Sequence, residues 1–154
     1  YAYGIRADLS YKGFDLNIFL QGIGKRDVEL GGNQFWGFGN EWHVPFPHAL
    51  DAWREDNRDA YFPRSTFENV TGNRQTQTRY LQDASYLRLT NITLGYTLPK
   101  AWLAKVGVEN LRLYVTGQNL LTFDHLFDIY DPETLGLDVY PIQKSISLGL
   151  NITL

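Results

Sequence analysis

The chain of 154 residues contains no cysteine and no methionine. Without cysteine it can form neither a disulfide framework nor a thiolate metal site. No stretch reaches the roughly 18 consecutive apolar residues that a membrane-spanning helix requires. Tyr1 leads directly into an alternating pattern, without the basic segment and apolar run of a signal peptide. We therefore expect that residue 1 is not the natural start of the protein.

A strong excess of one charge is also missing. The chain has 14 Lys and Arg against 17 Asp and Glu, and its formal net charge is −3. Acidic and basic residues are interspersed, whereas a nucleic-acid-binding protein presents a basic patch, so no nucleic-acid partner is predicted. With 44% apolar and 15% aromatic residues, the composition also argues against a disordered chain.

Apolar and polar residues alternate along much of the sequence. In residues 1–11 the odd positions are apolar or aromatic, and the even positions are small or polar. Similar alternation occupies four further segments, which are residues 14–20, 86–98, 111–121 and 142–154. A period of two is that of a β-strand with one apolar and one polar face. The pattern predicts an all-β fold with five strands.

The alternation changes phase once, within residues 86–98. Leu87 and Leu89 lie at odd positions, whereas the apolar residues from Ile92 onward lie at even positions. A β-bulge near Thr90 and Asn91 would return both sets to one face, because one extra residue resets the alternation.

The connections between these segments differ greatly in length. Lys12-Gly13 predicts a tight turn, and residues 99–110 form a moderate connection with a helical turn expected at 101–105. Residues 22–77 and 122–141 form two long loops. We interpret residues 78–82 as an extension of the third strand.

Outer-membrane barrels have short turns in the periplasm and long loops outside the cell. If the C-terminus is periplasmic, five antiparallel strands place every long loop outside and every short turn inside. Five strands cannot close a barrel, and an open edge in lipid leaves backbone groups unpaired. The chain is therefore predicted to be one part of a larger barrel.

Several stretches of the chain resemble the C-terminal region of the SusC/RagA family of TonB-linked outer-membrane proteins. They are YKGFDL (11–16), WREDNRDAYFPR (53–64), DASYLRLTNITLGYTLP (83–99), NLRLYVTGQNLLTF (110–123), YDPE (130–133) and SLGLNITL (147–154). Together these stretches cover most of the chain, and they occur in the order expected for the family. The resemblance implies that residues 1–154 form a single region, which supplies the last five strands of a transmembrane barrel of about 22 strands.

The same resemblance implies a function and a set of partners. Members import large nutrients, glycans or peptides, across the outer membrane of Gram-negative bacteria, chiefly Bacteroidota. The implied partners are the rest of the barrel and its plug, a SusD-like surface lipoprotein, TonB through the N-terminal region, and outer-membrane lipid. The main alternative from the residues alone is a soluble β-sandwich, such as a carbohydrate-binding module. Its strands, however, would average about 5–6 residues.

The first long loop is rich in aromatic residues and arginine. Aromatic faces stack on sugars or pack on a partner protein, and arginine binds carboxylates through two parallel hydrogen bonds. Five residues are predicted to contact a ligand or the SusD-like lipoprotein, which forms the lid of such importers. They are Trp36, Trp42, Trp53, Arg54 and Arg64. The alternative is that the loop aromatics only pack the loop on itself and on neighbouring loops.

Two sets of strand residues are predicted to face the membrane. The lipid-facing set is Ile146, Leu148, Leu150 and Ile152. The set at the membrane interfaces, where barrels carry aromatic girdles, is Tyr1, Tyr3, Tyr11, Phe14 and Tyr96.

No residue pattern predicts catalysis, a cofactor or a metal. His43 and His48 flank two prolines and lack a further ligand of suitable spacing for zinc. The last loop contains five acidic residues, Asp124, Asp128, Asp131, Glu133 and Asp138. They lack the regular spacing of a calcium loop, and a solvated acidic loop is the simpler interpretation, with calcium as the alternative. The chain is therefore not predicted to be an enzyme.

Overall fold

The computed structural model describes residues 1–37, 42, 44–66, 73, 75–104, 107–136 and 139–154. The chain divides into two units. The sheet unit comprises Tyr1–Arg26, Ala84–His125 and Tyr140–Leu154, and the loop unit comprises Asp27–Asp83 and Leu126–Val139.

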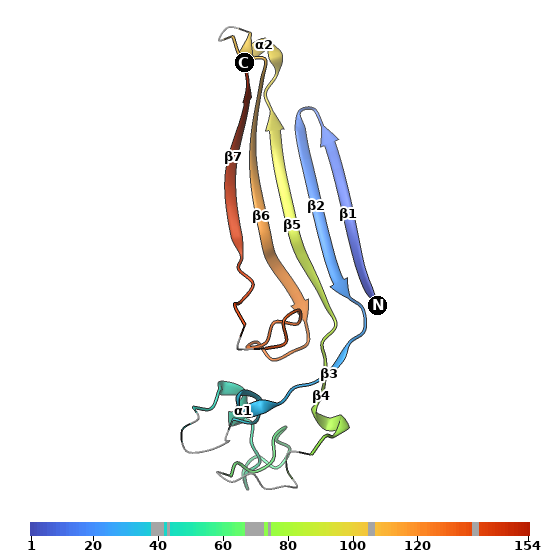
Figure 1. Ribbon diagram of the computed structural model, residues 1–154, viewed down its shortest axis with the longest axis vertical. Helices are drawn as coiled ribbons and strands as arrows, with labels where there is room; N and C mark the ends of the chain where they lie inside the picture. Colours follow the sequence, from blue (N-terminus) through green and yellow to red (C-terminus); the bar gives the residue numbers. More distant parts are fainter. Residues whose placement is uncertain (38–41, 43, 67–72, 74, 105–106, 137–138) are drawn as a thin grey trace. The chain divides into compact units, whose positions relative to one another are not determined.

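Five long antiparallel strands form the sheet unit. They are β1 (Ala2–Tyr11), β2 (Phe14–Ile23), β5 (Tyr86–Thr97), β6 (Asn110–Asp124) and β7 (Ser145–Thr153). Their order in the sheet is β1-β2-β5-β6-β7 (Figure 1). Strands of 9 to 15 residues reach the ~9–11 residues that a membrane strand needs. The predicted all-β fold with five antiparallel strands is confirmed.

The short connections leave one end of the sheet and the long ones leave the other (Figure 1). Lys12 and Gly13 join β1 to β2 with φ angles of 47° and 88°, and two positive φ values are those of a type I′ hairpin turn. At the same end, α2 (Lys100–Leu103) lies between β5 and β6. Short and long connections are thus sorted between the two ends of the sheet, and the assignment of these ends to the periplasm and the cell exterior stays a prediction.

The predicted bulge is present at Thr90. The pairing of β5 shifts between Leu89 and Asn91 against both of its neighbours, β2 and β6. Opposite this point on β6, Asn119 has a φ of 53°. The extra residue returns Leu87 and Leu89 to the face that carries the apolar residues from Ile92 onward, because directly paired residues share a face.

Rows of directly paired residues cross the apolar face of the sheet. Three central rows are aliphatic: Leu9, Leu16, Leu94, Val115 and Leu148; Ala7, Ile18, Ile92, Gly117 and Ile146; Ile5, Leu20, Leu89 and Leu121. The flanking rows carry the aromatic side chains: Tyr11, Phe14, Tyr96, Leu113 and Leu150 at one end; Tyr3, Gly22, Leu87 and Phe123 at the other. The apolar face therefore has an aliphatic band between two partly aromatic borders.

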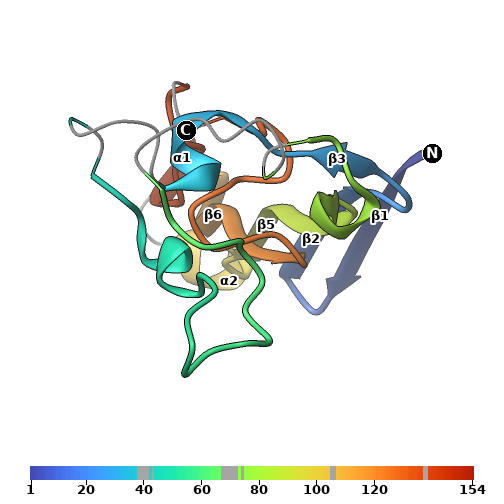
Figure 2. The same ribbon diagram turned by 90° about the horizontal axis from the view of Figure 1, so that it is seen from below.

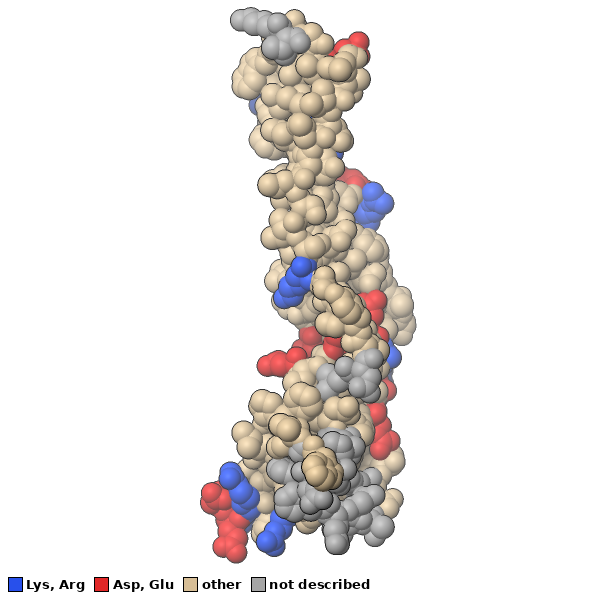
Figure 3. Space-filling model, turned by 60° about the vertical axis from the view of Figure 1, so that its left-hand side comes forward, with Lys and Arg blue, Asp and Glu red and all other residues tan. Residues whose placement is uncertain are grey.

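This band has the length of a membrane crossing along a tilted strand. Its two borders on β1 are Tyr3 and Tyr11, and at about 3.3 Å per residue they lie about 26 Å apart along the strand. Strands of barrels tilt by about 35–45° and need ~9–11 residues to cross the membrane. The apolar face is exposed, with Leu148 at 86% and Leu9 at 61%, and the surface over the sheet is mostly uncharged in Figure 3.

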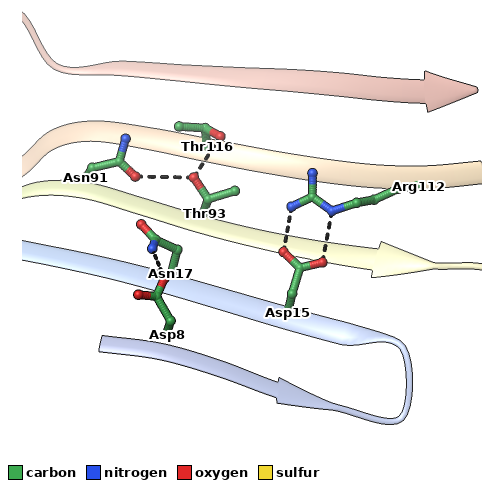
Figure 4. Close-up of polar contacts among 7 residues, drawn as sticks. All are labelled: Asp8, Asp15, Asn17, Asn91, Thr93, Arg112 and Thr116. Carbon is green, nitrogen blue, oxygen red and sulfur yellow. Dashed lines mark hydrogen bonds and ion pairs between the residues drawn. The ribbon is translucent and has the colours of Figure 1, made fainter. Parts of the chain in front are cut away.

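The opposite face of the sheet is polar (Figure 4). Arg112 on β6 donates from Nε and Nη2 to the two carboxylate oxygens of Asp15 on β2, at 2.9 and 2.5 Å. The pair crosses over β5 at Gly95, where a Cβ would lie 2.5 Å from Asp15 Oδ1 and 2.6 Å from Arg112 Nη2. Glycine at this position thus leaves room for an ion pair between two strands that are not neighbours.

Further hydrogen bonds follow the same polar face. Thr93 and Thr116 share a hydrogen bond of 3.0 Å between their hydroxyls, and Thr93 Oγ1 also donates to Asn91 Oδ1 at 3.2 Å. Asn17 donates to Asp8 across the β1–β2 pair. A sheet with one apolar and one hydrogen-bonded face is the pattern of a barrel wall between lipid and a polar lumen.

The loop unit contains short elements joined by irregular chain (Figure 2). They are β3 (Asp27–Glu29), α1 (Gly32–Trp36), the 3-10 turns η1 (Pro47–Leu50) and η2 (Thr78–Tyr80), and β4 (Leu81–Asp83). β3 and β4 pair as an antiparallel ribbon.

Several strand boundaries differ from the sequence prediction. β6 continues past residue 121 to Asp124, which still pairs with Tyr86 of β5. Residues 78–82 do not extend the third strand, because Leu81 onward pairs with β3 and buried Ala84 separates this ribbon from β5. β2 continues to Ile23, where it still pairs with Tyr86. β7 begins at Ser145 rather than residue 142, because its pairing with β6 starts at Gln118.

Candidate functional site

An aromatic cluster forms the core of the loop unit. Phe35 on α1 has no exposed surface, and its ring lies 5.2 Å from Phe62 and 6.3 Å from Tyr80 between centroids. Trp36 lies 4.8 Å from Tyr80 in an edge-to-face arrangement. Phe127 contributes from the second long loop and stacks against Phe62 at 6.1 Å. The two long loops therefore share one core, which fixes the chain segments around it.

Asp51 closes the segment that follows η1 into a turn, whose ends meet in a parallel bridge between Ala52 and Phe62. Its carboxylate accepts hydrogen bonds from Asn57 Nδ2 and from the backbone N–H of Tyr61, both at 3.0 Å. Backbone hydrogen bonds from Phe62 to Asp51 at 3.0 Å and from Trp53 to Phe62 at 2.9 Å run alongside. The turn holds residues 51–62 as one folded piece.

In the loop unit, hydrogen bonds lower the pKa of one carboxylate and burial raises the pKa of two tyrosines. The Asn57 amide, and then the Tyr61 backbone N–H, lower the pKa of Asp51. The stability that this carboxylate contributes is present above its ordinary pKa of about 3.9 and is lost as the pH falls through the lowered folded-state pKa. Burial raises the pKa of the Tyr61 and Tyr130 phenols.

Reciprocal hydrogen bonds join this turn to η2. Arg79 donates from Nε to the Tyr61 carbonyl at 3.1 Å and from Nη2 to the Ala60 carbonyl at 2.5 Å. The Tyr61 hydroxyl donates to the Arg79 carbonyl at 3.1 Å, and Gln82 donates to the Tyr61 hydroxyl. The hydrogen bonds of the Arg79 side chain thus hold the turn in place.

A first cleft lies on the surface of the loop unit. It encloses about 480 Å³ and is lined by Ala49, Leu50, Ala52, Trp53, Arg54, Glu55, Arg64 and Ser65. The Arg54 side chain already lies 3.6 Å from a carboxylate oxygen of Asp56. Trp53 is 38% exposed and offers ring surface to the cleft.

A second cleft shares two of these residues. It encloses about 360 Å³ and is lined by Trp53, Arg58, Ala60, Phe62, Pro63, Arg64, Asn73, Gln77, Arg79 and Tyr80. Trp53 and Arg64 therefore line both clefts. This arrangement can stack a planar or apolar group on aromatic surface and offer guanidinium donors to an anion.

The structure brings together three of the five predicted contact residues, which are Trp53, Arg54 and Arg64. Trp36 lies in the aromatic cluster, as the packing alternative expects, and Trp42 is 84% exposed. Contact of any of the five with a ligand or lid stays a prediction. The sequence prediction does not include Arg79, because its place at the second cleft depends on the hydrogen bonds to the turn.

The four residues predicted to face lipid lie together on the apolar face, and their contact with lipid stays a prediction. Ile146, Leu148 and Leu150 belong to its rows, and Ile152 pairs with Leu111 on the same face. Phe14 and Tyr96 contact at 4.5 Å between ring centroids at the short-turn end. Trp102 of α2, in the connection between β5 and β6, is 66% exposed. The sequence prediction does not include it.

The structure adds no metal or helical membrane site within its described ranges. No group of three or more His, Cys, Asp or Glu there could hold a metal ion. His43 and Asp138, named in the sequence interpretation, lie outside the described residues. None of the described helices has the length and hydropathy needed to cross a membrane.

Known proteins similar to this chain share one class. It is 34% identical over 170 residues to TonB-dependent receptor P3 of Formosa agariphila, covering 97% of this chain and 16% of the relative. It is 29% identical over 165 residues to TonB-dependent receptor P26 of the same organism, covering 98% and 16%. No protein-family model matches the chain.

Solved structures agree with these relatives. The RagAB peptide importer in its closed-closed state superposes with a TM-score of 0.72 at 27% identity, over 98% of this chain and 17% of that one. The chain matches a segment of the SusC/RagA family. A second structure, of the RagAB peptide transporter, gives a TM-score of 0.69 at 28% identity over 93% and 16%. The SusC/RagA resemblance seen in the sequence is confirmed, and the chain spans about one sixth of these relatives.

Proposed function

We propose that this chain forms five adjacent strands and two external loops of a SusC-like TonB-dependent importer for large nutrients. The barrel has about 22 strands, of which these are the last five. The observation that carries the proposal is the sheet itself, with an exposed aliphatic band on one face and hydrogen-bonded polar residues on the other. Within this assembly the chain supplies barrel wall and loop surface, and it performs no chemical reaction.

The edges of the sheet also favour a larger barrel. β1 and β7 are the end strands in the order of the five-stranded sheet. In lipid, unpaired backbone groups cost several kcal/mol each, so both edges need partner strands. A soluble carbohydrate-binding module would have to bury the aliphatic band that is exposed here, and the comparisons give that alternative no support.

The proposed partners are inferred from the proteins to which the chain is similar. The barrel contains a plug that receives energy through TonB, and the loop unit lies outside the cell, beside a SusD-like surface lipoprotein. The location is the outer membrane of a Gram-negative bacterium of the Bacteroidota, in line with the origin of the curated relatives in Formosa agariphila. The cargo is a glycan or a peptide, and the relatives in the solved structures are described as a peptide importer.

Surface labelling tests the topology. Cysteine placed at Asp56, whose side chain is 79% exposed on the loop unit, is expected to react with a membrane-impermeant thiol reagent on intact cells. Cysteine at Lys100 or Glu109, in the connection between β5 and β6, is expected to react only after the outer membrane is opened. The chain has no native cysteine, so each label within it reports one position. Labelling of Lys100 but not Asp56 on intact cells would invert the strand order and rule out the proposal.

Two tryptophan truncations separate ligand contact from loop packing. Trp53→Ala is expected to weaken substrate uptake or lid association while the amount of barrel in the membrane stays unchanged, because Trp53 lines both clefts. Trp36→Ala is expected to destabilise the loop unit by about 1–3 kcal/mol, because it removes a half-buried ring from the aromatic cluster. Protease sensitivity of the loops and uptake by intact cells are measured for both. Equal loss of loop folding in the two variants would assign Trp53 to packing alone.

A further inference from the structure

The second cleft concentrates positive charge in a chain whose net charge is −3. Three arginines, Arg58, Arg64 and Arg79, are among its described lining residues, and no aspartate or glutamate is. Arginine side chains beside one another repel, and the nearby Asp51 carboxylate, which is not among the lining residues, offsets part of the charge of Arg79. A cleft of this kind favours an anionic ligand.

Two of the three guanidinium groups already have protein partners. Arg79 donates to the carbonyls of Ala60 and Tyr61 at 2.5 and 3.1 Å. Arg58 donates from Nε to the Glu55 carbonyl at 3.3 Å. Arg64 makes no hydrogen bond or ion pair with any residue in the described ranges, and its side chain is exposed. Arg64 is therefore the guanidinium group whose complete set of donors remains available to a ligand.

The remaining walls of the cleft are largely apolar. Trp53, Phe62, Pro63 and Tyr80 supply ring surface, and the hydrogen bonds of Asp51 and Arg79 hold the segment that carries Trp53. A guanidinium beside aromatic surface matches a ligand in which an anionic group is attached to an apolar or planar body.

We propose that this cleft binds a carboxylate-bearing part of the cargo. Arg64 holds the carboxylate through two parallel hydrogen bonds, and the rest of the ligand packs on Trp53. The inference rests on the proposed function, because carboxylates are the usual anions of both cargo classes. A peptide offers its C-terminus or an acidic side chain, and a glycan offers a uronic acid.

The test uses the full-length receptor that contains this chain, purified in detergent, and calorimetric titration with two matched pairs. One pair is an N-acetylated alanine-glycine hexapeptide with a free C-terminus and the same peptide as its C-terminal amide. The other is a galacturonic acid trisaccharide and the neutral galactose trisaccharide. The acid of at least one pair is expected to bind about tenfold or more tightly than its neutral partner, because hydrogen bonds to a charged group are strong. The pair that shows the preference identifies the source of the carboxylate.

Substitutions assign the preference to Arg64. Arg64→Gln is expected to remove the advantage of the acid and to leave binding of the neutral partner unchanged. Lys25→Gln is the control, because it removes one positive charge from an exposed residue that is not among the lining residues of either cleft. It is expected to keep the preference. Arg64→Lys keeps the charge without the two-pronged geometry and is expected to retain only part of the preference.

Two results would overturn the carboxylate site. One is equal binding of acid and neutral ligand, in both pairs, by the unsubstituted receptor. The other is an equal loss of acid binding in Arg64→Gln and Lys25→Gln, which would indicate a general effect of charge. Either result in a receptor that still imports peptides or glycans leaves the importer function standing. Reversed surface labelling would instead remove the importer function itself.

Discussion

Replacing Leu148 with arginine is expected to destabilise the assembled barrel by roughly 2–4 kcal/mol, the cost of a charge on the lipid face near the bilayer midplane. Leu148 is 86% exposed and belongs to an aliphatic row that continues through Val115, Leu94 and Leu16. That row lies next to the central row of the band, so a guanidinium there cannot reach water without distorting the bilayer.

Ser147→Arg is the matched control for Leu148→Arg. Ser147 is adjacent in β7 but points to the polar face, where it pairs with Thr116. Arginine there has access to a polar lumen, and a cost below about 1 kcal/mol is expected, because charged residues in a lumen mainly tune selectivity. Both variants are measured by denaturant unfolding of the barrel in lipid vesicles. Equal costs for the two substitutions would show that β7 does not separate lipid from lumen.

Gly13→Val is expected to destabilise the barrel by about 2–5 kcal/mol, through the hairpin between β1 and β2. Gly13 has a φ of 88°, and the left-handed region costs a residue with a side chain roughly 1–2 kcal/mol. A Cβ at this position would also lie 2.8 Å from the carbonyl oxygen of Thr97. That oxygen belongs to the backbone, and relief of such overpacking typically costs a further ~1–3 kcal/mol.

The neighbouring turn residue provides the control. Lys12 has a φ of 47°, and asparagine tolerates this conformation better than lysine, so Lys12→Asn is expected to be neutral or slightly stabilising. The readouts are the fraction of heat-modifiable barrel on gels and the midpoint of denaturant unfolding. If Gly13→Val unfolds at the midpoint of the unsubstituted protein, the two-residue turn is not what fixes the register of β1 against β2.

The bulge at Thr90 shows how far sequence reasoning reaches in the sheet unit. Because side chains alternate strictly along a strand, a single change of phase between Leu89 and Ile92 required one extra residue, and pairing with β2 and β6 places it there. Strand ends were less predictable. Residues 78–82 and 142–144 have strand-like sequences, but whether such a segment joins the sheet depends on the partner that reaches it.

The clefts of the loop unit could not be predicted in the same way. Trp53 and Arg64 are eleven positions apart, and their shared position follows from the Asp51 hydrogen bonds and the Arg79 side chain that fold residues 51–62. Aromatic content marked the loop as a region of interest. It did not distinguish Trp36, which packs in the cluster, from Trp53, which is partly exposed.

The sequence by itself determined the five strands, the apolar face, the bulge and the end of the sheet from which each loop leaves. These features follow from local rules, since alternation has a period of two and one face must suit lipid. Three further features became visible only in the folded chain. Asp15 and Arg112 pair across Gly95. Phe127 joins the aromatic cluster, and Arg64 lines both clefts together with Trp53. Each of these depends on side chains from distant segments meeting in space, and no local pattern encodes which segments meet.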